Sequence, residues 1–583
     1  MSSLCQIQLN FFNKSILRRE FWAMKMLDMS SKISFGILHG NTRQFGLFTE
    51  CLDFKHTTEN EKIGIIYGQY CTVNQISFSN KSMVQKDFEQ KNLQFESGIC
   101  VPSSCNLEEV KNFANSFLKR ADLTVTDVFC QQNKTISLVT LDYFIIFILS
   151  LLLLTVIGST IYEMLLRKQP YKPKKVFISF SLYSNMKELF TIDNEKSRKI
   201  IACMNGLRSL AAFWVVAGHR TFRSKLMMSR PLNLSNNFVM TVITFLMTVE
   251  YAVDLFLLLS AILATQSCLR AFEKGNLNLV KIYVNRYLRY SPSVLFLLLF
   301  ILSFIPYTLV NGPSIRFLDK NVDKCQTYWL STILMVQNYA NVNNFCLGHT
   351  WYLNADFQLY LISPIFIFLL YKFRYKAFYA FLLIIIAIQS SVFYIRYNDI
   401  ITKHVVYRQT HYRIGQWLVG IAFGYFMYQI DKNTENFKLN KKIKFTCWFF
   451  TGTALIVTEV YYRIFQTHSL AKAFYEATNH IFFTIFFGWS ILAFHHLKSG
   501  SFVRWFLSHP LWQPTAKLSL SIYLVHDVYI RMTLANLKEL SYFDVSWLMH
   551  IIAGDILISI LFSIGLYLFV EAPIAKLLIF YLK

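Results

Sequence analysis

An arginine and a histidine share one apolar stretch of the sequence, NGLRSLAAFWVVAGH, from Asn205 to His219. Arg208 and His219 are eleven positions apart, so on an α-helix they lie within roughly 20° of one face and about 16 Å apart along the axis. They are too far apart to pair with each other. Each therefore needs its own partner or ligand.

His219 is the first candidate for chemistry. Imidazole titrates near neutral pH and can take the proton of a hydroxyl group as a general base. The alternatives are that His219 carries a transferred group transiently, or that it is an interfacial histidine without a chemical role. The sequence offers no rival nucleophile, because it contains no G-x-S-x-G elbow and no cysteine beside His219.

The composition predicts that these residues are carried by a membrane protein. Of the 583 residues, 54% are hydrophobic and only 16% are charged, which differs from a soluble domain. Runs such as Leu141 to Leu166 can cross a hydrocarbon core of about 30 Å. The net charge of +24 is concentrated in short segments between such runs. This favours the excess of Lys and Arg typical of cytosolic loops, with the bilayer and not nucleic acid as partner.

The apolar runs predict an all-α multi-pass membrane protein with about eleven transmembrane helices. The expected spans are residues 141 to 165, 205 to 222, 246 to 268, 290 to 310, 351 to 371, 376 to 397, 411 to 430, 445 to 465, 479 to 497, 518 to 536 and 546 to 570. The expected domains are residues 1 to 140, the first helix at 141 to 165, a basic linker at 166 to 200, and a membrane domain at 201 to 583.

The charges beside the first span predict the orientation. Residues 126 to 140 hold one basic residue and residues 166 to 180 hold five, so the N-terminal side is expected in the lumen or outside the cell. Eleven crossings then place the C-terminus in the cytosol, in the ER or the plasma membrane. Because the first residues lack a signal-peptide core, we expect either an absent upstream piece or a first span that acts as a reverse anchor.

Sequons and cysteines fit this orientation. The four glycosylation sequons, at Asn13, Asn80, Asn133 and Asn233, all fall in expected luminal segments. So do eight cysteines, whereas Cys203, Cys268 and Cys447 fall near the cytosolic face. We expect Cys325 and Cys346 to pair in one luminal loop. The other six, Cys5, Cys51, Cys71, Cys100, Cys105 and Cys130, should staple the N-terminal domain in one of fifteen pairings.

Motifs along the chain resemble the acyltransferase-3 family. Arg208 and His219 match its Arg-X10-His signature. VEYAVDLFLLLSA (Val249 to Ala261) and NRYLRYSP (Asn285 to Pro292) are similar to its second helix and its Arg-X-X-R motif. CLGHTWYLNADFQLYLISP, LSLSIYLVH and VEAP follow in order, and FWAMKMLDMSSKISFGILHGNTRQFGLFTECL resembles the cysteine-containing domain of animal "nose resistant to fluoxetine" proteins. Leu257 and Ala261 depart from common family residues, at positions that look like packing positions.

The resemblance implies a ten-helix acyltransferase-3 bundle, preceded by one extra helix and a luminal domain. It implies acyl-CoA as the cytosolic donor and a lipid or glycan-like hydroxyl as acceptor across the membrane. The runner-up function is uptake or transport of lipids or drugs without acyl transfer. A third possibility is a catalytically inactive scaffold. No metal-ligand spacing is evident, and His495 and His496 are expected to point to different sides.

The resemblance also assigns roles to charged residues. Arg208, Arg286 and Arg289 are expected to bind the donor, with Arg286 and Arg289 on one helix face. The alternative is that all three are cytosolic anchors. Asp254, four residues after Glu250, is expected to orient His219, or else to pair with an arginine. The other polar residues in or at the spans, for which helix-to-helix hydrogen bonding is favoured, are Asp356, Gln358, His526 and Glu571.

Overall fold

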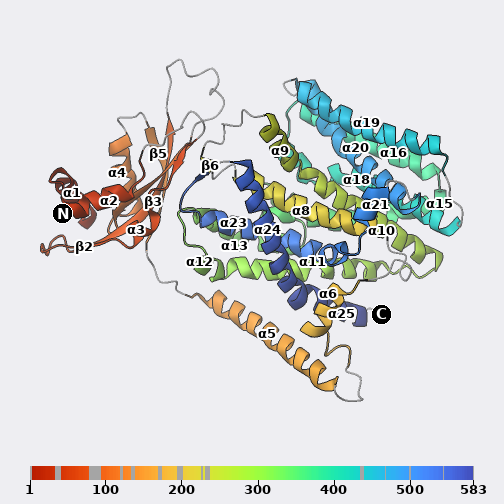
Figure 1. The fold of residues 1–583 in the computed structure, drawn as a ribbon, viewed down its shortest axis with the longest axis horizontal. Helices are drawn as coiled ribbons and strands as arrows, with labels where there is room; N and C mark the ends of the chain where they lie inside the picture. The colour runs from red at the N-terminus through yellow and green to blue at the C-terminus, as the bar shows by residue number, and fades with distance from the viewer. Residues whose placement is uncertain are drawn as a thin grey trace.

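The computed structural model describes residues 3–32, 41–77, 94–118, 123–132, 138–167, 174–192, 201–224, 228–229, 237–433, 439–465, 468–497, 501–542 and 544–581. Figure 1 shows two parts, a small N-terminal domain with a β-sheet and a bundle of long helices. The two termini lie at opposite ends of the molecule in this view.

The N-terminal domain contains a five-stranded sheet, which the expected all-α fold class did not include. Strand β3 (Ile65–Ser77) pairs antiparallel with β4 (Gln94–Pro102), β5 (Leu123–Gln131) and β2 (Lys55–Thr57), and β1 (Arg43–Gln44) lies parallel to β4. Ile66 and Tyr70 are buried in β3, whereas Ile65 and Tyr67 are exposed. This alternation is typical of a half-buried strand, but residues 68–73 are all buried, so the alternating signal is brief and weak beside the long apolar runs.

Helices complete this domain, and three disulfides cross-link its elements. Helices α1 (Leu4–Leu17), α2 (Phe21–Met29) and α3 (Phe48–Leu52) precede β3, and α4 (Leu107–Leu118) follows β4. The pairs are Cys5–Cys105, Cys51–Cys100 and Cys71–Cys130. Cys71 and Cys130 face each other directly in the β3–β5 register. The structure therefore selects one of the fifteen possible pairings.

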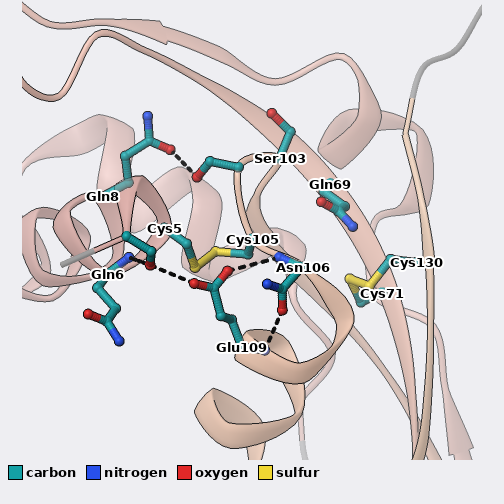
Figure 2. The surroundings of a disulfide bond; sticks show 12 residues. Cys5, Gln6, Gln8, Gln69, Cys71, Ser103, Cys105, Asn106, Glu109 and Cys130 are labelled. Atoms are coloured by element: carbon teal, nitrogen blue, oxygen red, sulfur yellow. Dashed lines mark hydrogen bonds between the residues drawn. A yellow bond between two sulfur atoms is a disulfide. The ribbon is translucent and has the colours of Figure 1, made fainter. Parts of the chain in front are cut away.

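Figure 2 shows how Cys5–Cys105 is held beside the start of α4. The Asn106 side chain accepts a hydrogen bond from the Glu109 backbone at 2.9 Å, and Glu109 accepts one from the Asn106 backbone at 3.0 Å. This reciprocal cap satisfies two backbone donors that the helix itself leaves unpaired. The Ser3 hydroxyl also donates to Glu109, at 2.5 Å, so α1 and α4 are joined by a hydrogen bond as well as by the disulfide.

A helix occupies each of the eleven positions expected to cross the membrane. They are α5 (Thr140–Leu166), α8 (Cys203–Ser224), α10 (Glu250–Glu273), α11 (Leu279–Leu302), α15 (Trp351–Phe373), α16 (Lys376–Tyr397), α18 (Ile414–Asn433), α19 (Lys441–Phe465), α20 (Ser469–His495), α23 (Ser519–Ala535) and α24 (Val545–Leu566). Within the described ranges, six helical segments are long and apolar enough to span a bilayer. The number eleven is therefore not established. Helices α8 and α23 are absent from the six; their arginines and histidines lower their hydropathy, and α23 has only 17 residues.

Shorter elements connect these helices. They are α6 (Leu182–Phe190), β6 (Met228–Ser229), α9 (Asn237–Met247), α12 (Ile305–Leu309), α13 (Arg316–Ile333), α14 (Gln337–Ala340), η3 (Gly348–Thr350), α17 (Lys403–Arg408), η4 (Thr410–Arg413), α21 (Ser501–Leu507), α22 (Trp512–Lys517), β7 (Ser541–Tyr542), the π-helical turn η5 (Tyr567–Glu571) and α25 (Ala572–Tyr581). Cys325 in α13 forms a disulfide with Cys346 just before η3. We refer to this end of the bundle as the disulfide end, and to the opposite end, where α6 and α25 lie, as the linker end.

Helix α10 forms the centre of the bundle, and most of its residues are buried. Its closest neighbour is α18, which turns Gly420 and Gly424 toward it. A Cβ added at Gly420 would lie 2.6 Å from the Cβ of Ala261, and one at Gly424 would lie 2.9 Å from the Cβ of Thr265. Small residues four apart let two helices approach closely in a membrane. Ala261, one of the two positions that depart from common family residues, thus lies at a packing contact between α10 and α18.

The remaining sequence-based expectations concern cysteines and sequons. Cys203, Cys268 and Cys447 are not part of a disulfide. Asn13 is exposed on α1. The other three sequon residues, Asn80, Asn133 and Asn233, lie outside the described residues. Glycosylation stays a prediction.

Candidate active site

His219 lies in the half of α8 nearer the disulfide end and hydrogen-bonds His526 of α23. Its Nδ1 is 2.8 Å from His526 Nε2, and His526 Nδ1 is 3.1 Å from the carbonyl oxygen of Ile522. A carbonyl only accepts, so Nδ1 of His526 carries a proton and, in the neutral ring, Nε2 accepts. Nδ1 of His219 must then donate. The lone pair of neutral His219 is left on Nε2, as a general base requires.

Asp527, next to His526, is the carboxylate beside this pair. It is almost fully buried and ion-paired with Arg223 of α8. One carboxylate oxygen lies 2.9 Å from Arg531 Nε and 3.3 Å from His349 Nδ1. The other lies 4.0 Å from His219 Nδ1. Four side chains from three elements thus converge on one carboxylate.

His349 completes the cluster from the short helix η3. Its Nε2 lies 3.0 Å from the carbonyl oxygen of Leu524, and its Nδ1 faces Asp527. Both ring nitrogens therefore face oxygen atoms that can only accept hydrogen bonds. The Tyr523 hydroxyl donates to the backbone oxygen of His349. These contacts fix η3 against α23.

The expectation that Asp254 orients His219 is wrong. Asp254 lies 2.5 Å from His480 Nδ1 and 3.3 Å from Arg413 Nη1, and it makes no hydrogen bond or ion pair with His219. The sequence alternative, pairing with an arginine, describes its place correctly. Asp254 is fully buried on α10, where η4 and α20 supply its partners. The carboxylate beside His219 is Asp527.

Glu250 belongs to the same cluster as Asp254. It lies 3.1 Å from Lys403 Nζ and 3.9 Å from His480 Nε2. This cluster is distinct from the one around His219.

The arginines expected at the donor side surround two cavities at the linker end. Arg208 and Arg289 line both, and Lys281 and Lys517 line the larger one. The larger cavity holds about 590 Å³ and the smaller about 180 Å³. The shared lining places the two cavities next to each other. Within the described parts of the chain, neither Arg208 nor Arg289 makes a hydrogen bond.

Arg286 lines the smaller cavity but differs from the other two arginines. Its guanidinium is ion-paired with Asp356 and hydrogen-bonded to Ser260. Asp356 also accepts a hydrogen bond from the Tyr290 hydroxyl at 2.8 Å. Arg286 is therefore largely committed to holding α10, α11 and α15 together.

The last two polar residues expected in the membrane have separate places. Gln358 hydrogen-bonds Asn338 and Thr410, which links α14, α15 and η4. Glu571 ends the π-helical turn η5, accepts a hydrogen bond from Ser521 at 2.7 Å and lines the larger cavity. Single π-turns often occur at functional sites.

Tyr523 connects the cavities to the histidines. It lines the smaller cavity, and its ring centroid lies 5.8 Å from that of His526 and 5.7 Å from that of His349. Arg208 and Tyr523 thus line the same cavity. Tyr523 contacts His526, and His526 hydrogen-bonds His219.

Four residues of the site were not predicted from the sequence: Arg223, His349, Asp527 and Arg531. Two of them carried a signal. Arg223 is four residues after His219 and Arg531 four after Asp527, a spacing that puts each pair on one helix face. Nothing in the spacing indicates that α23 lies against α8, so the Asp527 partnership needs the tertiary structure.

Among the described residues outside this site, a group of one carboxylate and two histidines could hold a metal ion. Ligand atoms of Asp431, His495 and His496 lie within 4.8 Å of one another at the linker end. The two histidines were expected to diverge, but their ring centroids are 4.5 Å apart. His496, the C-cap of α20, keeps helical backbone angles with φ −90° and ψ −38°, so the two rings approach through their side-chain orientation, with an interplanar angle of 75°.

Residues 201–568, which carry both the histidine cluster and the cavities, match the family described as "Acyltransferase domain". The chain belongs to this acyltransferase family. Residues 5–114 match the "Nose resistant-to-fluoxetine protein, N-terminal domain". The resemblance seen in the motifs is confirmed in both parts of the chain. This membership makes the chain a multi-pass membrane protein with an acyltransferase domain.

Two curated relatives come from Caenorhabditis elegans. "Nose resistant to fluoxetine protein 6" is 22% identical over 613 aligned positions, which cover 88% of this chain and 72% of the relative. "Regulator of hypoxia-inducible factor 1" is 25% identical over 445 positions, which cover 70% of this chain and 85% of the relative. No solved structure matches this chain.

Proposed function

We propose that this acyltransferase-family chain moves an acyl group from acyl-CoA, bound at the linker end, to an acceptor hydroxyl at the disulfide end. The linker end faces the cytosol and the disulfide end faces the lumen or the outside of the cell. The observation that carries the proposal is the link between the arginine-lined cavities and His219. Tyr523 lines the smaller cavity and contacts His526, which hydrogen-bonds His219.

The donor side rests on charge and space. Arg208 and Arg289 line both cavities and keep their guanidinium groups available for a ligand. Arginine binds phosphate oxygens with two parallel hydrogen bonds, which suits the diphosphate of CoA. Arg208 and His219 are about 16 Å apart along α8, a distance that a long donor can bridge with its thioester next to the histidine.

The chemical step uses the lone pair on Nε2 of His219. This atom accepts the proton of the acceptor hydroxyl while the oxygen attacks the thioester carbonyl carbon. An ester C–O bond forms, the C–S bond breaks, and CoA leaves as a thiolate that takes up the proton.

Transport is the second candidate, since adjacent cavities also make a partial passage through the bundle. The name of one relative refers to resistance to the drug fluoxetine. In a transporter the same polar residues would line the path of a lipid or drug, and no covalent bond would change. Acyl-CoA would then be dispensable.

Labelled acyl-CoA supplied to membranes that contain the full chain separates the two functions. Acyl transfer predicts a labelled ester product that depends on the chain and disappears in His219→Ala. Uptake of labelled lipid or drug that continues without acyl-CoA, with no labelled ester, would reject the transferase. The control is the same substitution at another histidine, His404→Ala, because His404 is exposed on α17, away from the cluster around His219.

A further inference from the structure

The cluster around Asp527 contains more positive than negative charge. Arg223 and Arg531 are permanently protonated, and both pair with the single carboxylate of Asp527. In the neighbouring pair, Arg220 and Asp555 neutralise each other, with Nη2 and Oδ1 2.7 Å apart. It therefore supplies no charge to balance the second arginine.

The charges are also arranged in depth. The side chains of Asp527 and His349 are 2% and 1% exposed, whereas those of His219, Arg223 and Arg531 are 28%, 20% and 21% exposed. A molecule that approaches the site therefore meets one imidazole and two guanidinium groups. The carboxylate lies behind them and already accepts three hydrogen bonds from Arg223 and Arg531.

Both arginines retain unused donors. Arg223 uses Nε and Nη2 on Asp527, and Arg531 uses Nε. Their other N–H groups have no hydrogen-bond partner among the residues that the structure describes. In a region of low dielectric, unused donors and an uncompensated positive charge favour binding of an anion.

The backbone opposite Arg531 leaves room for its guanidinium. A Cβ placed on Gly348 would lie 3.7 Å from Arg531 Nη2, so η3 packs directly along the arginine. The Cys325–Cys346 disulfide holds the chain two residues before Gly348. The site is thus built from two long helices and one disulfide-anchored turn.

We propose that this cluster is a binding site for an anionic group of the acceptor, of the phosphate type. Arg223 and Arg531 bind the phosphate oxygens through their unused N–H groups, and the acceptor hydroxyl then faces Nε2 of His219. The role of the hydroxyl rests on the proposed acyl transfer. The anion site itself rests only on the cluster.

The binding test uses the full chain in detergent without acyl-CoA, at constant ionic strength. Thermal stability is measured with glycerol 3-phosphate and with glycerol, which differ only in the phosphate. Glycerol 3-phosphate is expected to raise the melting temperature in a concentration-dependent manner, and glycerol is not. Equal effects of the two compounds would overturn the proposal.

Variants locate the binding. Arg531→Gln is expected to weaken binding of glycerol 3-phosphate about tenfold to hundredfold. Arg531→Lys keeps the charge, loses the forked geometry and should fall between. Arg316→Gln is the control, because this arginine pairs with Asp127 at the N-terminal domain. Arg223→Gln provides a second variant if Arg531→Gln does not fold. Equal affinities in the Arg531 and Arg316 variants would reject the site.

Transfer assays separate this proposal from the proposed function. Lysophosphatidic acid and monoacylglycerol both offer a hydroxyl, but only the first carries a phosphate. A preference for lysophosphatidic acid of about tenfold or more, lost in Arg531→Gln with the KM for acyl-CoA unchanged, supports the anion site. Equal use of both acceptors overturns it and leaves acyl transfer intact. Arginine-dependent binding without any transfer overturns the proposed function and supports the site.

The source of the phosphate is separated by a third probe. Inorganic phosphate that stabilises the chain as well as lysophosphatidic acid does assigns the site to free phosphate groups. Stabilisation by lysophosphatidic acid alone assigns it to a lipid headgroup. Stabilisation by neither overturns the proposal.

Discussion

At the scale of single residues, the proton arrangement of two histidines decides what His219 can do. The Ile522 carbonyl fixes the protonated nitrogen of His526, and His526 in turn fixes that of His219. His526 is therefore a positioning residue. It acts on the acceptor only through His219.

Replacement of His526 by phenylalanine should lower the rate of transfer without removing the base. His526→Phe keeps a ring of similar shape but loses both hydrogen bonds, so kcat is expected to fall about 100-fold, with the KM for acyl-CoA unchanged. His219→Ala should lower kcat at least as much. The double variant should equal His219→Ala alone, because the two residues act as a unit. Additive losses, measured by steady-state kinetics, would contradict this role; His404→Phe is the control.

Arg208 is expected to contribute to binding of the donor and not to the chemical step. Arg208→Ala removes a guanidinium that lines both cavities, so the Kd for CoA should rise about tenfold to hundredfold. Isothermal titration with CoA measures this directly. Arg270→Ala serves as the control. Arg270 lies at the linker end of α10, and its Nη2 donates a hydrogen bond to Gln266 at 3.1 Å. Equal Kd values for the two variants would refute the assignment.

At the scale of elements, a buried ion cluster ties α10 to η4 and α20. Asp254, Arg413 and His480 contribute one side chain each. Removing one partner of a buried pair leaves an uncompensated charge in the bundle, which costs more than the pair contributes. The cluster therefore stabilises the packing of helices around the site and does not take part in it.

Asp254→Asn should destabilise the chain by about 3 to 5 kcal/mol, because Arg413 loses its buried carboxylate. The melting temperature of the purified protein reports this change. Asp127→Asn, which opens a pair whose aspartate is 47% exposed, should cost at most about 1 kcal/mol. Transfer per folded molecule should stay close to that of the unchanged chain in both variants. A selective loss of transfer in Asp254→Asn would restore Asp254 as a partner of His219.

At the scale of the whole molecule, the two ends of the bundle differ in chemistry. The disulfide end carries Cys325–Cys346, the His219 cluster and the N-terminal domain with its three disulfides. The linker end carries the arginine-lined cavities and the cysteines Cys203 and Cys268, which are not part of a disulfide. Disulfides form in oxidising compartments and free thiols persist in reducing ones. This contrast supports the proposed orientation.

Engineered sequons test the orientation. Asn343→Thr creates a sequon at Asn341, at the disulfide end, and Asn278→Thr creates one at Asn276, at the linker end. We expect an added glycan at Asn341 and none at Asn276, because only the luminal side meets the glycosylation machinery. The measurement is a mobility shift reversed by a glycosidase, relative to the unchanged chain. A glycan at Asn276 alone would invert the proposed topology.

The sequence by itself determined the positions of the long helices, the shared face of Arg208 and His219, and the family. These features depend on local periodicity and on runs of apolar residues, which a single segment carries. The strands of the N-terminal domain were missed because the alternation of buried and exposed residues in them is brief. Disulfide pairing and strand order could not be predicted from the sequence, because both depend on which segments meet in the fold.

Only the tertiary structure decided which carboxylate serves His219. Asp254 is closer to it along the chain, but α10 turns that side chain toward Arg413 and His480. Asp527 is 308 positions away, and it lies beside His219 because α23 packs against α8. Partners across helices are chosen by the packing of whole faces, which no local spacing records. The residue types thus determine the chemistry of the site, and the tertiary structure determines which of these residues meet.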